Sequence, residues 1–192
     1  MWLPHGKPSD TVSAVKRRVL LMVRHGQYDM REGSELRLTD MGRAQADHVG
    51  RSLAKERIDA FHASSLIRAR ETAELVRKHV RMDFKVSDLL CEGFPSRAKG
   101  YPTDTIATDR LRFDEAYALF MGKPLESSTE LLVCHGNIIR YFVCRALSIP
   151  VSRWLRFATN HTGVTRLVVR DDGACGVVSY NETAHLPPEL VT

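Results

Sequence analysis

The stretch that decides the fold is residues 19–26, which read VLLMVRHG. Five apolar residues that run into a glycine-terminated polar pair are typical of a buried strand ending at the edge of a sheet. In open α/β sheets, ligands bind at that edge, outside the carboxyl ends of the strands. This strand delivers Arg24 and His25 there. A guanidinium binds phosphate or carboxylate oxygens and a neutral imidazole can act as a nucleophile or base, so the stretch indicates a site for an anionic substrate.

Outward from this strand, strand and helix patterns alternate along the chain. Two strand patterns flank residues 171–173, whose Asp-Asp-Gly sequence is a strong hairpin signal. The alternation predicts an α/β fold, namely a three-layer α/β/α sandwich with a largely parallel sheet and an antiparallel edge hairpin. Glycines and prolines between residues 92 and 108 predict a long irregular loop. The expected strands are 19–23, 60–65, 84–90, 130–134, 165–170 and 175–180, and the expected helices are 39–57, 66–80, 110–121 and 137–147.

Length and composition indicate one soluble domain. A chain of 192 residues with 43% hydrophobic and 27% charged residues fits a single globular unit. We expect that unit to span residues 19–192, preceded by a flexible extension over residues 1–18. The 28 Lys and Arg against 23 Asp and Glu give a formal charge of +5. This excess suits anionic substrates, and it is too small and too dispersed to indicate a nucleic-acid partner.

The cysteines and the apolar runs indicate in which cellular compartment the chain is expected and whether it spans a membrane. The four cysteines show neither a C-x-x-C pair nor metal-ligand spacing, which favours a reducing compartment. No apolar run approaches the ~20 residues of a transmembrane helix, so we expect no membrane segment in this chain. Residues 1–18 lack the apolar core of a signal peptide. Any anchor or targeting segment of the natural protein would therefore lie outside this chain.

The ends of the predicted strands carry a matching set of polar side chains. His135 is followed by Gly136 at the end of a second buried strand, as His25 is followed by Gly26. Arg68 comes just after the strand that ends in two serines, and Glu92 follows the third strand. Parallel neighbouring strands place their carboxyl ends at one edge. Two imidazoles, two guanidiniums and one carboxyl are therefore predicted to line one cleft.

That set of groups matches phosphoryl transfer through a phosphohistidine. A phosphoryl group in transfer carries charge on three oxygens, which Arg24 and Arg68 can bind in fork geometry. One imidazole attacks phosphorus, and the other, if protonated, donates to the same oxygens. A carboxyl with a raised pKa can protonate the leaving alkoxide. This chemistry requires no metal, and we expect no cofactor.

These motifs resemble the histidine phosphatase superfamily, the phosphoglycerate mutase-like proteins. The resemblance extends over most of the chain, from about residue 19 to the C-terminal segment. It implies the phosphoglycerate mutase-like fold, with His25 as the nucleophile, Arg24, Arg68 and His135 as the phosphate pocket, and Glu92 as the proton donor. Within the superfamily, the chain most resembles the mitochondrial serine/threonine protein phosphatases. The segments that carry this resemblance are 23–28, 38–43, 62–69, 89–93, 134–147 and 154–156.

The chain departs from its relatives at several positions. Gly26 stands where those protein phosphatases have serine, and the segment between Glu92 and His135 is shorter. Residues 28–31 read YDMR, where the mutases carry a Trp-Asn pair. The mutases are also longer, so both facts argue against a mutase. The relatives' membrane anchor and assembly motif are not visible, although Trp2 is a stray candidate for the latter.

The resemblance implies a metal-independent phosphatase that acts on phosphoserine or phosphothreonine in proteins. Its partners would be a phosphoprotein substrate and phosphate. The resemblance also implies a homodimer and a mitochondrial location. Without the resemblance, a cytoplasmic location is expected. Two alternatives remain open. One is a small-molecule phosphatase or mutase for sugar or glycerate phosphates, and the other is a catalytically silent scaffold of the same fold.

Other polar residues are weaker candidates. His161 follows Asn160 in a loop, and a structural role is favoured over contact with substrate. His62 is expected to be a hydrogen-bonded structural residue. Asn137 could either orient His135 or cap the helix that follows it. Arg140 is interpreted as structural, and the expected surface histidines are His48, His79 and His185.

Overall fold

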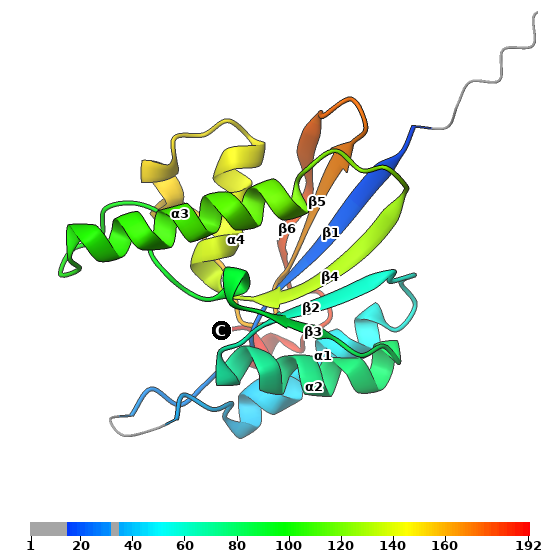
Figure 1. Cartoon of the computed structure of the whole chain (residues 1–192). Coiled ribbons are helices and arrows are strands. Elements are labelled where there is room, and N and C mark those ends of the chain that lie inside the picture. The colour runs from blue at the N-terminus through cyan, green and yellow to red at the C-terminus, as the bar shows by residue number, and fades with distance from the viewer. Residues whose placement is uncertain (1–14, 32–34) are drawn as a thin grey trace, which may run out of the picture.

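The computed structural model describes residues 15–31 and 35–192, which form a twisted sheet covered by helices on both faces (Figure 1). Six strands run in the order β3-β2-β4-β1-β5-β6 within these residues. The helices α1 and α2 cover one face, and α3 and α4 cover the other. The strands are β1 (Arg17–Arg24), β2 (Ala60–Ser64), β3 (Lys85–Ser87), β4 (Ser128–Cys134), β5 (Val164–Arg170) and β6 (Cys175–Glu182); the helices are α1 (Asp40–Leu53), α2 (Ile67–Val80), α3 (Thr103–Phe120) and α4 (Gly136–Ala146).

The predicted fold class is confirmed by the strand directions. β3, β2, β4 and β1 pair in parallel, whereas β5 pairs with β1 and β6 in the antiparallel direction. The register places Val23 opposite Val133 and Arg24 opposite Cys134. The residues that follow these pairs are His25 and His135. Parallel pairing in this register therefore brings the two imidazoles to the same sheet edge.

Strand β1 is buried on both faces, as a central parallel strand should be. Leu20 and Met22 pack into the core under α3 and α4, and Leu21 and Val23 pack into the core under α1 and α2. All four side chains are inaccessible to solvent. Burying such a side chain contributes roughly 1.5–3 kcal/mol. The alternation fixes the register, because a slip by one residue would exchange the two faces.

Two element boundaries, the end of β3 and the start of α3, differ most from the prediction. Strand β3 ends at Ser87, and residues 88–90 form a 3₁₀ turn that buries Leu90. Helix α3 begins at Thr103, seven residues before the predicted start, and the preceding Pro102 supplies a carbonyl to Ile106 N–H. Its first two turns are largely exposed, so they lack the apolar period that predicts a helix. The irregular loop after Glu92 is therefore shorter than expected, because it ends at Pro102.

The predicted N-terminal extension is only partly covered by the structure. Residues 1–14 lie outside the described residues, and β1 begins at Arg17, inside the span assigned to the extension. The single domain predicted for residues 19–192 stays a prediction. Among the described residues, no helix is both long enough and apolar enough to cross a membrane.

Two glycines let the loop after β1 approach the start of α1 closely. A Cβ on Gly42 would lie 1.9 Å from the carbonyl oxygen of Gln27, and a Cβ on Gly26 would lie 2.4 Å from that of Gly42. Both obstacles are backbone atoms, which cannot rotate away. This contact explains why glycine, and no larger residue, follows His25 here. Thr39 completes the junction, because its hydroxyl accepts a hydrogen bond from Gly42 N–H at 3.1 Å and caps α1.

We expect Gly42→Ala to lower the free energy of unfolding by about 3 kcal/mol, since overpacking against backbone typically costs 1–3 kcal/mol or more. Chemical denaturation measures this change. Gly176→Ala is the matched control, because a Cβ at Gly176 meets nothing within 4 Å. If Gly42→Ala and the wild type have the same free energy of unfolding, the backbone at Gln27 can shift to accommodate a methyl group, and the prediction is wrong.

Candidate active site

The five residues predicted from the strand ends meet at one site at the carboxyl edge of the parallel strands. The ring centroids of His25 and His135 lie 4.9 Å apart. Arg68 Nε lies 3.2 Å from His25 Nε2, and the Arg24 side chain packs beside the start of α4. Glu92 accepts hydrogen bonds at that same helix start. The structure thus brings together all five side chains.

The His25 ring is held in one tautomer. Its Nδ1 lies 2.8 Å from the carbonyl oxygen of Gly26, which can only accept, so Nδ1 carries the proton. Nε2 then holds a lone pair, toward which Arg68 Nε–H donates. Burial, together with His135, Arg68 and Arg24, holds the pKa of His25 well below its usual 6.5. The ring is therefore neutral at physiological pH, with Nε2 as its free basic atom.

His135 is also buried and neutral. Its Nε2 lies 2.8 Å from Ser64 Oγ at the end of β2. Burial, then Arg68 and Arg24, hold the pKa of His135 well below 6.5. A hydroxyl that donates to Nε2 would leave the proton on Nδ1.

Several polar atoms around these rings lack hydrogen-bond partners. Four of the six such buried atoms in the described residues lie here: Arg24 Nε, His135 Nδ1, Thr159 Oγ1 and His161 Nε2. A buried polar group without a partner costs about 1–3 kcal/mol, so a cluster of them calls for a specific explanation. An anion seated beside His25 would accept from the nitrogen donors. The arrangement is that of a preformed anion cradle.

Glu92 lies where its protonated form is favoured. Burial raises the pKa of its carboxyl, while Gly93 N–H, Arg68, Asn137 N–H and Arg24 act in the opposite direction. Its Oε1 accepts from Gly93 N–H at 3.3 Å and from Asn137 N–H at 3.2 Å. The latter belongs to the first turn of α4. A carboxyl held here can both release and take up a proton.

Helix α3 fixes the loop that carries Glu92. Arg112 donates to the carbonyl oxygens of Cys91 and Glu92, and it pairs with Asp109 at 2.9 Å. Asp109 in turn accepts from Phe94 N–H at 2.9 Å. The acid is thereby attached to a rigid helix rather than to a free loop. This contact also accounts for the early start of α3, because Asp109 lies in the part of the helix that the sequence did not predict.

Asn137 has a role that differs from both alternatives raised by the sequence. Its Nδ2 donates to the carbonyl oxygen of Gly93 at 2.9 Å, so it holds the loop beside Glu92. The hydrogen bonds described for its side chain go to Gly93 and Arg140 rather than to His135, and the start of α4 has no side-chain cap. Arg140 donates to Asn137 Oδ1 at 2.9 Å and to the Phe157 carbonyl at 2.7 Å. The structural interpretation of Arg140 agrees with these contacts.

Two residues at the site were not expected there, and a third, His161, was only a weaker candidate. Tyr28 lies edge-on to His25, with 5.1 Å between ring centroids, and the Arg68 guanidinium carbon lies 4.8 Å from the Tyr28 centroid. Ser64 holds His135, as described above. His161 lies 5.7 Å from the His25 ring. The strand-end argument could have found Ser64, since it ends β2, but no local pattern marks Tyr28 or His161.

The ring of His161 forms part of the wall of the site, and the expectation that it does not contact substrate stays a prediction. Its Nδ1 lies 2.9 Å from Thr192 Oγ1, and Thr192 Oγ1 also accepts from Gln45 Nε2 at 2.9 Å. Burial lowers the pKa of His161 to about 4. The segment before residue 192 thus folds back onto the site and sets the position of a third imidazole. His62, by contrast, packs against Phe120, as a structural residue would.

The buried neutral histidines make stability depend on pH. Below about pH 6.5 the unfolded chain protonates these imidazoles, whereas the folded chain keeps His25 and His135 neutral to lower pH. Unfolding takes up protons in that window, so the free energy of unfolding falls as the pH falls. We expect Tm to drop by about 5–10 °C between pH 6.5 and 5, as measured by calorimetry.

The control for this pH dependence is the variant His25→Gln, which removes one of the two groups. Its Tm should fall less steeply over the same window. A constant Tm of the wild type from pH 6.5 to 5 would show that the buried imidazoles do not govern acid stability.

Comparison with known proteins decides the family. The family model described as the histidine phosphatase superfamily (branch 1) matches residues 20–129 and 123–183. The chain belongs to the histidine phosphatase superfamily. It is an enzyme of the phosphatase class within that superfamily, as its similarity to named phosphatases supports. No group of three or more His, Cys, Asp or Glu able to hold a metal ion occurs among the residues that the structure describes.

Relatives of this histidine phosphatase include curated serine/threonine-protein phosphatases. The mitochondrial Pgam5 of Caenorhabditis briggsae is 34% identical over 193 residues, which cover 93% of this chain and 68% of that protein. The human mitochondrial PGAM5 is 33% identical over 95% of this chain and 68% of its own length.

Solved structures show the same fold. A phosphoglycerate mutase from Plasmodium falciparum is 31% identical, with a TM-score of 0.65 over 92% of this chain and 98% of that one. The YhfR protein of Bacillus stearothermophilus has a TM-score of 0.71 at 23% identity, over 88% of this chain and 98% of that one.

Proposed function

We propose that this histidine phosphatase removes phosphate from phosphoserine or phosphothreonine in proteins, with His25 forming a phosphohistidine. The observation that carries the proposal is the state of His25: a neutral ring whose Nε2 lone pair accepts from Arg68 Nε–H, in a site that also holds buried polar atoms without partners. Two of the relatives described above are named as serine/threonine-protein phosphatases, which supports this substrate class.

The first step transfers the phosphoryl group to the enzyme. Arg24, Arg68 and His135 bind the phosphoryl oxygens, and Arg68 then donates to them instead of to His25 Nε2. The freed lone pair of Nε2 forms a bond to phosphorus as the bond to the ester oxygen breaks. Glu92 gives its proton to that oxygen, and the alcohol leaves. The Gly26 carbonyl, bonded to Nδ1–H, stabilises the positive charge on the phosphorylated ring.

The second step returns the enzyme to its starting state. Glu92, now a carboxylate, takes a proton from water as the water oxygen attacks phosphorus. The bond between Nε2 and phosphorus breaks, and the electron pair returns to Nε2. Phosphate leaves, His25 is again neutral and Glu92 is again protonated. The raised pKa of Glu92 suits both directions of proton transfer.

A second candidate function is a phosphatase or mutase for phosphorylated metabolites. The observation that favours it is the similarity to the phosphoglycerate mutase from Plasmodium falciparum. Both functions use the same five residues, so only the substrate separates them.

A substrate panel tests the two functions. Phosphate release is measured with phosphoserine and phosphothreonine peptides and, in parallel, with glycerate and sugar phosphates. We expect the highest kcat/KM with a phosphopeptide. Preference for a phosphorylated metabolite would favour the second function, and absence of turnover with any substrate would leave the scaffold alternative.

The cellular compartment and the oligomeric state of the enzyme are proposed from its resemblance to other proteins alone. The relatives' names include the word mitochondrial, so we propose the same compartment for this chain. The homodimer implied by the family resemblance stays a prediction, which size-exclusion chromatography with light scattering can test.

A further inference from the structure

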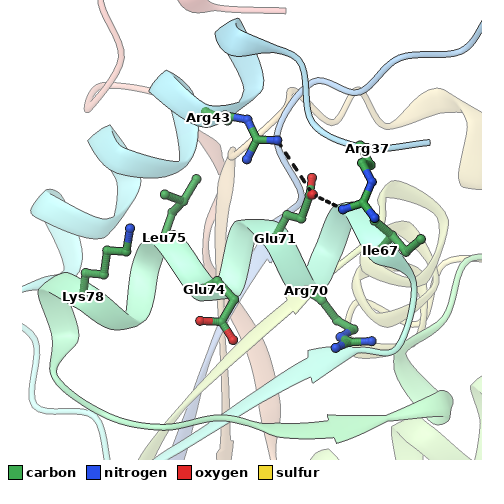
Figure 2. Close-up of a pocket in the computed structure, with 8 residues that line it drawn as sticks. All are labelled: Arg37, Arg43, Ile67, Arg70, Glu71, Glu74, Leu75 and Lys78. Carbon is green, nitrogen blue, oxygen red and sulfur yellow. Dashed lines mark hydrogen bonds and ion pairs between the residues drawn. The ribbon is translucent and has the colours of Figure 1, made fainter. Parts of the chain in front are cut away.

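A hollow of about 430 Å³ lies along one face of α2 (Figure 2). Ile67, Arg70, Glu71, Glu74, Leu75 and Lys78 line it from one side of the helix, at the spacing that places residues on one helical face. Arg43 of α1 and Arg37 of the preceding segment lean over it from above in the view of Figure 2. We call this hollow the α2 groove.

The α2 groove carries an excess of positive charge. The negative charge of Glu71 is already paired within the protein. Its carboxylate lies 2.8 Å from Arg37 and 3.7 Å from Arg43, and it accepts a hydrogen bond from Leu38 N–H. Glu74 is paired with Arg77, which lies 2.6 Å away. Arg70 and Lys78 form no ion pair within the part of the chain that the structure describes. Both are exposed, so the two cations are available to a partner.

Two residues that line the α2 groove are next in the sequence to residues of the catalytic centre. Ile67 immediately precedes Arg68, whose Nε contacts His25. On the opposite wall, Arg37 precedes Leu38, which forms a β-bridge with Tyr28 next to the His25 ring. From Ile67 to Lys78 the helix rises about 16 Å, at 1.5 Å per residue. About five extended residues fit that length at ~3.3 Å each.

We propose that the α2 groove binds an acidic segment of the protein substrate, next to the phosphorylated residue in the catalytic centre. The cations of Arg70 and Lys78 attract carboxylates, and Ile67 and Leu75 offer apolar surface to the peptide between them. A groove whose lining residues adjoin Arg68 and Leu38 along the chain suits a peptide continuous with the phosphoresidue. This proposal rests on the proposed function, and it narrows the substrate to phosphoproteins with acidic residues close to the phosphorylated position.

The test compares two phosphoserine peptides, one flanked by Asp and Glu and the other by Gly and Ser, in three enzyme forms. The test variant is R70E/K78E, and the matched control is R17E/K123E, which makes the same charge change at the other end of the sheet, where Arg17 begins β1 and Lys123 lies against Gly173 in the turn between β5 and β6. We expect wild type and control to prefer the acidic peptide about tenfold in kcat/KM at low salt, and less at high salt. In R70E/K78E the preference should vanish while turnover of an aryl phosphate stays unchanged.

Equal kcat/KM of the wild type for the two peptides would overturn the proposal, as would an equal loss in the control variant. If neither phosphopeptide is turned over, the proposed function fails separately. The α2 groove is then tested by fluorescence anisotropy with the unphosphorylated acidic peptide, which must bind the wild type more tightly than R70E/K78E. Binding of anionic lipid vesicles but not of this peptide would also overturn the proposal.

Discussion

Replacing His25 with alanine is expected to reduce phosphate release from a phosphoserine peptide by about 10⁴-fold or more, the scale seen when a nucleophile is removed. Nε2 is the atom that would bond to phosphorus, because the Gly26 carbonyl holds the proton on Nδ1 and leaves the lone pair on Nε2. Arg24, Arg68 and His135 can still bind substrate in the variant. The loss should therefore fall on kcat far more than on KM.

Two measurements separate the loss of a nucleophile from the loss of the fold. His62→Ala is the matched control, because it removes an imidazole from the same sheet but outside the site, and it should keep most of its activity. Brief exposure of the wild type to labelled substrate should trap an acid-labile, base-stable phosphate that His25→Ala lacks. Turnover by a folded His25→Ala within tenfold of the wild type would refute the covalent mechanism.

The fold was largely predictable because its signals are local. Residues 19–23 are apolar throughout, since β1 is buried on both faces, and such a run is visible without any structural knowledge. The start of α1 was equally clear, because Thr39 caps it through its own side chain. The start of α3 was not, because residues 103–109 are held by contacts with the Glu92 loop and by backbone hydrogen bonds. Such contacts leave no apolar period in the sequence.

The residues of the candidate site also fall into two groups, those that a local pattern predicts and those that only long-range contacts bring to the site. Arg24 ends β1, and His25 and His135 follow strands that pair in parallel, so topology alone brings the three together. His161 reaches the site only because the segment ending at Thr192 folds back and is held by Gln45, a contact across 147 positions. No spacing rule expresses that distance.

Tyr28 illustrates a second limit. It faces His25 because residues 28 and 38 form an isolated bridge, which holds the loop after β1 against the catalytic centre. A single bridge has no repeating pattern that could predict it. The residues that surround the catalytic centre, such as Tyr28 and His161, were therefore harder to predict than the centre itself. In a superfamily that shares one centre, such surrounding residues determine which substrate is bound.

The variant Glu92→Gln is expected to slow hydrolysis of phosphoserine by about 10²–10⁴-fold, the usual contribution of a general acid. A serine alkoxide is a poor leaving group unless it is protonated, whereas a nitrophenolate needs no proton. Hydrolysis of an aryl phosphate should therefore be slowed much less in the transfer step. Single-turnover kinetics with the two substrates measures that step apart from the attack by water.

The pH profile gives an independent readout of the same role. Because burial raises the pKa of Glu92, the protonated acid persists to higher pH than an ordinary carboxyl allows. Transfer from phosphoserine should decline as the pH rises through that pKa, and the decline should be absent in Glu92→Gln. The control is Asp88→Asn, which removes a carboxylate near the same loop but outside the site. If Glu92→Gln slows transfer from the aryl and alkyl substrates equally, Glu92 positions the substrate and another group supplies the proton.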